Sequence, residues 1–146
     1  MGGSFGGYSA LMGLIRSPDL YACGISLAGV TDWEDVLEHG QAMNPTQIPF
    51  NADRVGDPSS EALKAISPVY LVDKIRDPLL IIHGRDDPIV PYDQTKKLTA
   101  ALDKAGKSYE LIAKFNELHG IANYKNRIDL FNSVETFLAK HMPADQ

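Results

Sequence analysis

A serine, an acid pair and a histidine occur along the chain in the order Ser4, Asp86-Asp87, His119. A serine hydroxyl becomes a nucleophile when a histidine removes its proton and a carboxylate orients that histidine. Residues 2–6 read Gly-Gly-Ser-Phe-Gly. They fit G-x-S-x-G, in which the serine lies on a sharp strand-to-helix turn and the glycines give the backbone room to close. These residue types predict nucleophilic chemistry at an acyl carbonyl.

The acid pair and the histidine each follow a strand-like run of apolar residues. Residues 79–82 lead to Asp86-Asp87, and residues 111–115 lead to His119. In proteins with this serine turn, the acid and the histidine come after the serine in that order. On its own, the glycine-rich turn also fits an ordinary loop. The order of the three residue types favours the nucleophile.

Periodicity predicts the elements that must position these side chains. Helices are expected at 6–16, from the capping-box pair Thr31 and Glu34 onward, and at 61–66, 92–105 and 126–141. Strands are expected at 21–28, 78–84 and 108–115. The last helix is predicted to pack on the sheet through Leu130, Phe131, Val134, Phe137 and Leu138. Residues 38–59 lack periodicity, so we expect an irregular lid or substrate-binding segment there.

Strands that alternate with helices imply right-handed crossovers and a mostly parallel sheet flanked by helices, an α/β fold. A serine on a strand-to-helix turn needs a strand before it, yet only three residues precede Ser4. We therefore expect the chain to begin in the middle of a domain and to lack its N-terminal strands. All 146 residues are expected to form one C-terminal portion of a single domain.

Composition excludes several classes of partner. The chain is 44% hydrophobic and 23% charged with a net charge of −5, so neither nucleic acid nor an anionic membrane is an expected partner. No apolar run approaches the roughly 20 residues of a membrane span, and no signal peptide opens the chain. The single Cys23 is expected to be a buried hydrophobe in a cytoplasmic protein. No cofactor is predicted, and no Cys, His and Asp cluster has metal-ligand spacing.

Together the motifs resemble the C-terminal part of an α/β-hydrolase, and more narrowly the catalytic domain of the prolyl oligopeptidase family of serine peptidases. The resemblance rests on residues 2–8, on His83-Gly84 followed by Asp87 and Val90-Pro91, on His119-Gly120, and on the closing helix. The family pattern, His-Gly, two residues, Asp, two residues, Val-Pro, assigns the acid to Asp87, with Asp86 as the alternative. It treats His83 as structural. His39, in the irregular segment, and His141 have no evident partner arrangement.

The resemblance implies the roles of the remaining site residues. The N–H of Phe5 would stabilise an oxyanion, with a second donor from a region outside this sequence. Phe5, Val30, Trp33, Val36 and Val90 would line an apolar pocket for the residue before the scissile bond; Trp33 also fits ordinary helix packing. The substrate would be a short peptide or an acylated peptide.

Two other interpretations stay open at the level of sequence. One is a carboxylesterase or dienelactone-hydrolase-like enzyme on the same scaffold; Gly6-Gly7-Tyr8 and Trp33 favour the peptidase. The other is an inactive hydrolase fragment or an interaction module, which would associate with a missing N-terminal portion or with further copies of itself.

Overall fold

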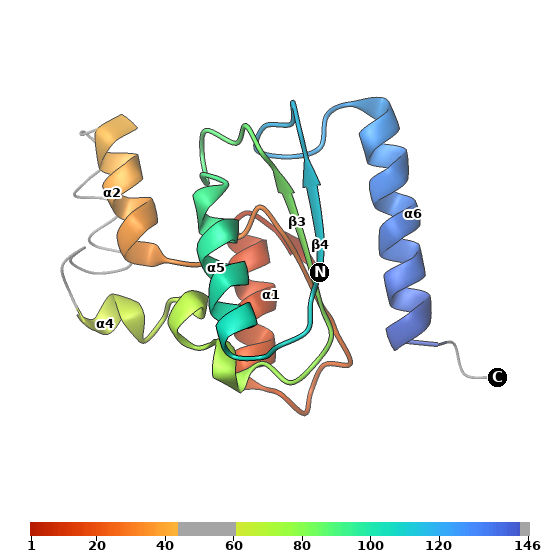
Figure 1. Cartoon of the computed structure of the whole chain (residues 1–146), viewed down its shortest axis with the longest axis horizontal. Helices are drawn as coiled ribbons and strands as arrows, with labels where there is room; N and C mark the ends of the chain where they lie inside the picture. The colour runs from red at the N-terminus through yellow and green to blue at the C-terminus, as the bar shows by residue number, and fades with distance from the viewer. Residues whose placement is uncertain (44–60, 144–146) are drawn as a thin grey trace.

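The computed structural model describes residues 1–43 and 61–143, and these form one parallel sheet with helices on both sides. The strands are β1 (Gly2–Gly3), β2 (Gly24–Leu27), β3 (Leu79–Gly84) and β4 (Glu110–Lys114), in the spatial order β1-β2-β3-β4. Each neighbouring pair is parallel. The prediction of an α/β fold with a parallel sheet is confirmed (Figure 1).

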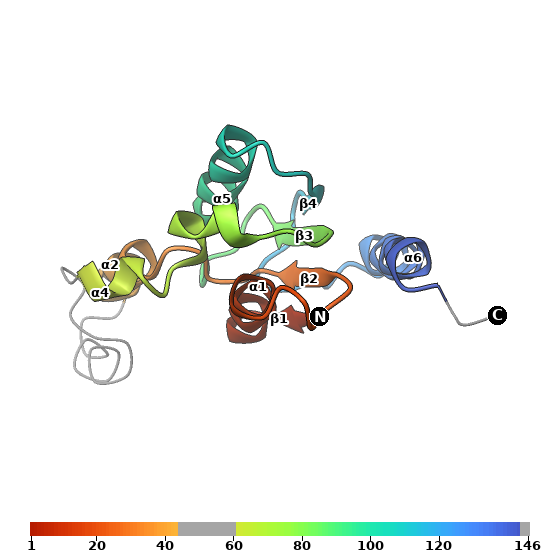
Figure 2. The same cartoon turned by 90° about the horizontal axis from the view of Figure 1, so that it is seen from below.

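The helices divide between the two faces of the sheet. Helix α1 (Phe5–Arg16) and helix α5 (Asp93–Lys104) cover one face, and α6 (Tyr124–His141) lies on the other (Figure 2). The remaining helical segments are α2 (Trp33–Met43), α4 (Glu61–Lys64), and the short 3-10 turns Pro68–Tyr70 and Val72–Lys74. None of the described helices is long and apolar enough to cross a membrane.

Successive side chains of β3 point to opposite faces of the sheet and pack in the hydrophobic core on each face. Leu79 and Ile81 pack in the cluster that α1 and α5 cover, whereas Leu80 and Ile82 pack against α6. All four are at most 2% exposed. A strand buried on both faces is apolar at nearly every position, which is why the apolar run within residues 78–84 predicts a strand.

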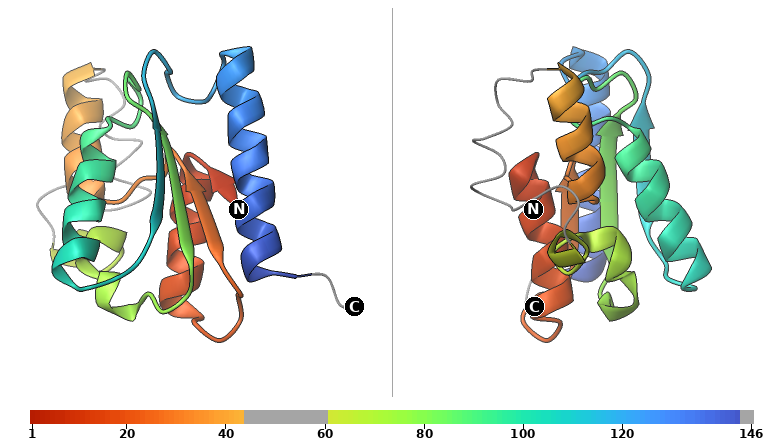
Figure 3. Two further views of the ribbon diagram at one scale, coloured as in Figure 1. Left: turned by 45° about the vertical axis from the view of Figure 1, so that its right-hand side comes forward. Right: turned by 90° about the vertical axis from the view of Figure 1, so that its left-hand side faces the viewer.

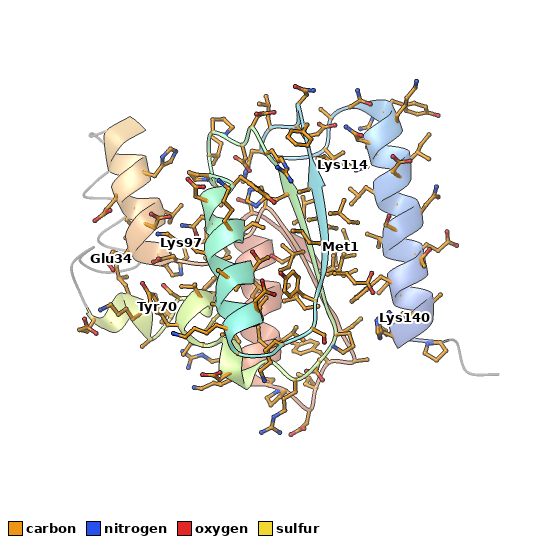
Figure 4. All side chains as sticks on the ribbon, viewed as in Figure 1. Met1, Glu34, Tyr70, Lys97, Lys114 and Lys140 are labelled. Atoms are coloured by element: carbon orange, nitrogen blue, oxygen red, sulfur yellow. The ribbon has the colours of Figure 1, made fainter. Side chains whose placement is uncertain are left out.

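Helix α2 begins differently from the prediction. Thr31 does not cap it: the Thr31 hydroxyl donates to the backbone oxygen of Gln94, and the Thr31 N–H donates to Gln94 Oε1, both at 2.8 Å. Gln94 is fully buried and also accepts from the N–H of Asp32. Lys97 lies between α5 and α2 (Figure 4) and pairs with Asp35 at 2.8 Å. Gln94, distant in sequence, therefore engages the Thr31 hydroxyl, and Asp32 stands at the cap position instead, with its Oδ1 3.5 Å from the N–H nitrogen of Asp35.

Three further expectations need correction or fall outside the structure. Helix α2 continues to Met43, so the start of the segment expected to be irregular is helical; the rest of that segment, residues 44–59, lies outside the described part. Phe131 is 60% exposed, because α6 contacts the sheet through the narrow line Leu130, Val134 and Phe137. Cys23 is half-buried rather than buried, since it precedes β2, and burial raises the pKa of its thiol.

Close contact between α1 and the end of β2 depends on two glycines. A Cβ on Gly7 would lie 2.8 Å from the Cα of Gly29 and 2.9 Å from the oxygen of Leu27. Those atoms are backbone and cannot turn aside. In contrast, a Cβ on Gly6, one residue earlier on α1, would meet nothing within 4 Å.

This contrast predicts opposite effects of one methyl group. Gly7→Ala should destabilise the fold by about 1–3 kcal/mol, because backbone must move to admit the Cβ. Gly6→Ala should be neutral or stabilise by up to ~1 kcal/mol, since alanine is the better helix former. Urea unfolding of the two variants and the wild type measures both; equal stabilities for the two variants would contradict the proposed close contact.

Candidate active site

Ser4 lies at the turn between β1 and α1 with φ 57° and ψ −122°, a backbone conformation that side-chain-bearing residues rarely adopt. Two sets of hydrogen bonds hold it there. Its N–H donates to the oxygen of Leu27 at 2.8 Å, and its own oxygen accepts from the N–H groups of Gly7 and Tyr8. The strained turn expected for the serine is therefore present, and it places Ser4 at the N-terminus of α1.

His119 and Asp87 complete a chain of hydrogen bonds from this serine. Ser4 Oγ lies 2.9 Å from His119 Nε2, and His119 Nδ1 lies 2.7 Å from Asp87 Oδ2. The carboxylate can only accept, so Nδ1 carries the proton and Nε2 accepts from the serine hydroxyl. The loops after β3 and β4, which carry the acid and the histidine, rise at the same end of the sheet (Figure 3).

The carboxylate of Asp87 is enclosed and fully hydrogen-bonded. Oδ1 accepts from the N–H groups of Ile89 at 2.8 Å and Val90 at 3.0 Å, and Oδ2 faces His119 and also His83 at 3.2 Å. Burial raises the pKa of Asp87, but the hydrogen bonds from His83, His119, Val90 and Ile89 more than offset it and lower this pKa to about 2. Asp87 therefore stays ionised beside His119.

Asp86 has a different task from its neighbour. Its side chain is exposed and accepts from the N–H of Asn116 at 2.7 Å, while its own N–H donates to the oxygen of Glu117. Asp86 thus ties the loop after β3 to the loop after β4. The structure brings Asp87, and not Asp86, to His119.

Glu117 is a buried carboxylate whose role the sequence did not reveal. It is 1% exposed and accepts from the N–H groups of Ala122 and Asn123 and from Asn126 Nδ2. The hydrogen bond from Asn126 is the main cause that lowers the pKa of Glu117. Its position two residues before His119 could have indicated this role from the sequence, because an acid buried in a tight loop needs backbone N–H donors around it.

The loop of His119 also lies directly on the end of β3. A Cβ on Gly84 would come within 2.3 Å of the oxygen of Leu118 and 2.4 Å of the oxygen of Glu117. Only glycine fits at that point. The glycine of the His83-Gly84 motif is therefore required for steric reasons.

The other histidines differ in their surroundings. His39 lies on α2 rather than in an irregular segment, and its Nε2 is 3.0 Å from the oxygen of Pro88, so it does have a partner. His141 packs against the ring of Phe137. His83 is 1% exposed and contacts Asp87, Val90 and Thr95.

The residues expected to line an apolar pocket gather in one cluster beside the serine. Val30, Trp33 and Val90 are buried there, and Val36 packs against them. The ring of Phe5, 61% exposed, lies 6.2 Å from that of Trp33. Trp33 therefore both packs in the cluster and faces the residue that follows Ser4.

The end of the sheet opposite to Ser4 carries a hollow. A hollow of about 520 Å³ lies near the N-terminal ends of β3 and β4, away from Ser4; its lining includes Asp77, Tyr109 and Lys140. Among residues 1–43 and 61–143, no group of three or more His, Cys, Asp and Glu side chains is placed to hold a metal ion.

A parallel sheet with a serine on the turn after one strand, an acid after a later strand and a histidine after the next defines an α/β-hydrolase. The sequence profile of the prolyl oligopeptidase family matches residues 1–145, so the chain belongs to that family.

Individual relatives agree with this membership. The chain is 34% identical to dipeptidyl aminopeptidase BIII of Pseudoxanthomonas mexicana, over 96% of this chain and 21% of that protein. It is 31% identical to dipeptidyl peptidase family member 6 of Caenorhabditis elegans, over 94% of this chain and 19% of that protein. The chain thus spans about a fifth of the length of these relatives.

Solved structures show the same fold. The acylaminoacyl peptidase of Pyrococcus horikoshii superposes with a TM-score of 0.86 at 25% identity, over 99% of this chain and 24% of that one. A puromycin-hydrolyzing peptidase of Mycobacterium tuberculosis gives a TM-score of 0.87 at 24% identity, over 99% and 22% of the two chains.

The low pKa of Asp87 predicts a pH-dependent contribution to stability. Because the folded state holds this pKa at about 2, below its usual 3.8, the contribution is complete above about pH 4 and disappears as the pH falls towards 2. The shift corresponds to about 2 kcal/mol. The stability gap between wild type and Asp87→Asn should shrink by about that amount between pH 5 and pH 2.

Urea unfolding at a series of pH values measures this gap. Asp129→Asn is the matched control, since the Asp129 side chain is exposed and, within the described part of the chain, its carboxylate pairs only with Lys114, at 3.2 Å. Its gap to wild type should stay small throughout. A gap for Asp87→Asn that does not change with pH would show that the carboxylate is not held as described.

Proposed function

We propose that this chain carries the catalytic residues of a serine peptidase that hydrolyses peptide bonds of short peptides through an acyl-enzyme. One observation carries the proposal: the continuous hydrogen-bond chain from Ser4 through His119 to Asp87, with spacings of 2.9 and 2.7 Å. These are the nucleophile, base and orienting acid that acyl transfer requires. The family membership of the chain supports the same chemistry.

In the proposed reaction, Ser4 Oγ attacks the substrate carbonyl carbon while His119 Nε2 takes the hydroxyl proton. Asp87 holds the imidazole in the tautomer that can accept and stabilises the imidazolium that forms. The tetrahedral intermediate collapses as His119 returns the proton to the leaving amine. Water then attacks the acyl-enzyme with His119 again as base, which releases the acid product and restores Ser4.

The oxyanion of that intermediate would be stabilised at the start of α1. The N–H of Phe5 is among the first in a helix of 12 residues, and such N–H groups have no partner within the helix. They point their positive ends at a developing charge. We propose that a second donor comes from outside the described residues.

Substrate preference follows from the aromatic and apolar groups beside Ser4. We place the side chain that precedes the scissile bond against Phe5, Trp33 and the valines of the same cluster, Val30, Val36 and Val90. Relatives are named dipeptidyl peptidases and acylaminoacyl peptidases. Short peptides or acylated peptides are accordingly the proposed substrates, and the esterase alternative has no comparable support.

The remaining parts of the proposal concern setting and assembly. We place the protein in the cytoplasm, because a single cysteine offers no intrachain disulfide. Among the described strands, β1 pairs only with β2, and we propose that its other edge takes a further strand or another copy of the chain.

Loss of the nucleophile tests the proposal. In the natural protein, Ser4→Ala should abolish covalent labelling by a fluorophosphonate probe and reduce peptide turnover by at least about 10³-fold. Ser9→Ala is the matched control: Ser9 also lies near the start of α1, but its hydroxyl is exposed and donates to the oxygen of Phe5. Full labelling of Ser4→Ala would refute the assignment.

The two adjacent acids provide a second test. Asp87→Ala should lower kcat by about 10³- to 10⁴-fold, because His119 loses the group that fixes its tautomer. Asp86→Ala should lower kcat by less than about tenfold, since it removes one hydrogen bond between two loops. Steady-state kinetics on a short peptide, with circular dichroism to verify folding, measure both; the reverse ranking would move the catalytic acid to Asp86.

A further inference from the structure

A second histidine shares the carboxylate that orients His119. His83 lies in β3 and is 1% exposed. Its Nε2 is 2.9 Å from the oxygen of Val90 and 3.2 Å from Asp87 Oδ2, and its Nδ1 is 2.6 Å from Thr95 Oγ1. Both ring nitrogens are therefore occupied, one by the turn that carries the acid and one by helix α5.

The chemistry of these partners fixes where the proton lies. A backbone oxygen and a carboxylate oxygen accept only, so Nε2 must carry a hydrogen and share it between Val90 and Asp87. Nδ1 then accepts from the Thr95 hydroxyl, which is itself 2% exposed. The neighbours thus select the tautomer of His83 with its hydrogen on Nε2.

From this geometry we infer that His83 is a positioning residue for Asp87, and this inference rests on the proposed function. Its Nε2–H connects the first and last residues of the turn 87–90 and presents Oδ2 to His119 Nδ1. The ring is anchored on the most buried strand of the sheet, so it ties a surface turn to a rigid support. By donating to Nδ1, the Thr95 hydroxyl stabilises the Nε2–H tautomer of His83 that binds Asp87 and Val90.

A ring that only fills space at this position would behave differently. The rings of Tyr92 and His83 pack in a T-shaped arrangement with centroids 5.6 Å apart, so the imidazole also has apolar contacts. Leucine keeps bulk but has no donor, whereas the side-chain NH₂ of glutamine can replace the Nε2–H. Positioning requires the donor; packing requires only the volume.

The experiment compares His83→Gln with His83→Leu in the natural protein, with the rate of fluorophosphonate labelling as readout. We expect labelling by His83→Leu to fall roughly ten- to hundredfold, the range for loss of a hydrogen bond to a charged group, and labelling by His83→Gln to stay within about threefold of wild type. Thermal unfolding verifies that both are folded at the assay temperature. Equal labelling rates for the two variants would overturn the inference.

Two threonines of helix α5 allow a matched test of whether Thr95 holds the His83 tautomer. Thr95→Val removes the donor to His83 Nδ1, whereas Thr99→Val removes a hydroxyl that bonds to the oxygens of Thr95 and Lys96 and to the Tyr109 side chain, away from His83. Labelling should fall about tenfold in Thr95→Val and remain at the wild-type rate in Thr99→Val. Equal rates in the two would remove Thr95 from the arrangement.

A spectroscopic readout separates this inference from the proposed function. Nitrogen NMR of histidine-labelled Ser4→Ala protein needs no activity, and the His83 signal is assigned by its loss in the added His83→Gln change. We expect His83 in the Nε2–H tautomer, and a downfield His119 Nδ1–H signal that survives His83→Gln and is lost in His83→Leu. An Nδ1–H tautomer of His83 would overturn the inference, even if wild-type Ser4 is labelled normally. Absent labelling with the expected tautomer would refute only the proposed function.

Discussion

The buried carboxylate of Asp87 is the constraint on which the candidate site depends. An ionised carboxylate with no exposed side-chain surface is stable only when hydrogen-bond donors surround it. Here the donors come from its own turn, from β3 and from the loop after β4. Satisfying one charge therefore fixes three segments relative to one another, and His119 is aimed at Ser4 as a consequence.

The serine end of the site is fixed by close packing of backbone. Ser4 has a positive φ, and its N–H and oxygen are held by β2 and by the first turn of α1. The bond to β2, from the Ser4 N–H to the oxygen of Leu27, accompanies the close approach of α1 to the end of β2 that Gly7 and Gly29 permit. Such a strained residue persists where the surroundings determine its conformation several times over. Tight packing around Ser4 and hydrogen bonding around Asp87 thus fix the two ends of the Ser4–His119–Asp87 hydrogen-bond chain independently.

Sequence patterns gave the order of the elements because each pattern reports local burial. The apolar run of β3 and the spacing on α1 follow directly from which faces contact the core. The geometry of parallel strands then brings residues at strand ends to one edge, which is why Ser4, the acid pair Asp86-Asp87 and His119 were expected to lie close together; the choice of Asp87 within the pair came from the family resemblance. Phe131 was misplaced for the same reason: periodicity gives the direction of a face and not the width of the contact.

Polar contacts between distant residues were beyond this reasoning. Gln94 binds the Thr31 hydroxyl that was expected to cap α2, and Glu117 organises the turn after His119, yet neither has a periodic signature. The acid pair shows the limit most clearly. Asp86 and Asp87 are adjacent and chemically identical, but one is exposed on a loop and the other is buried in a turn. They differ in the direction of the side chain after the end of β3. Hydrogen-bond donors set that direction: the N–H of Asn116 binds Asp86, and the imidazoles of His83 and His119 bind Asp87.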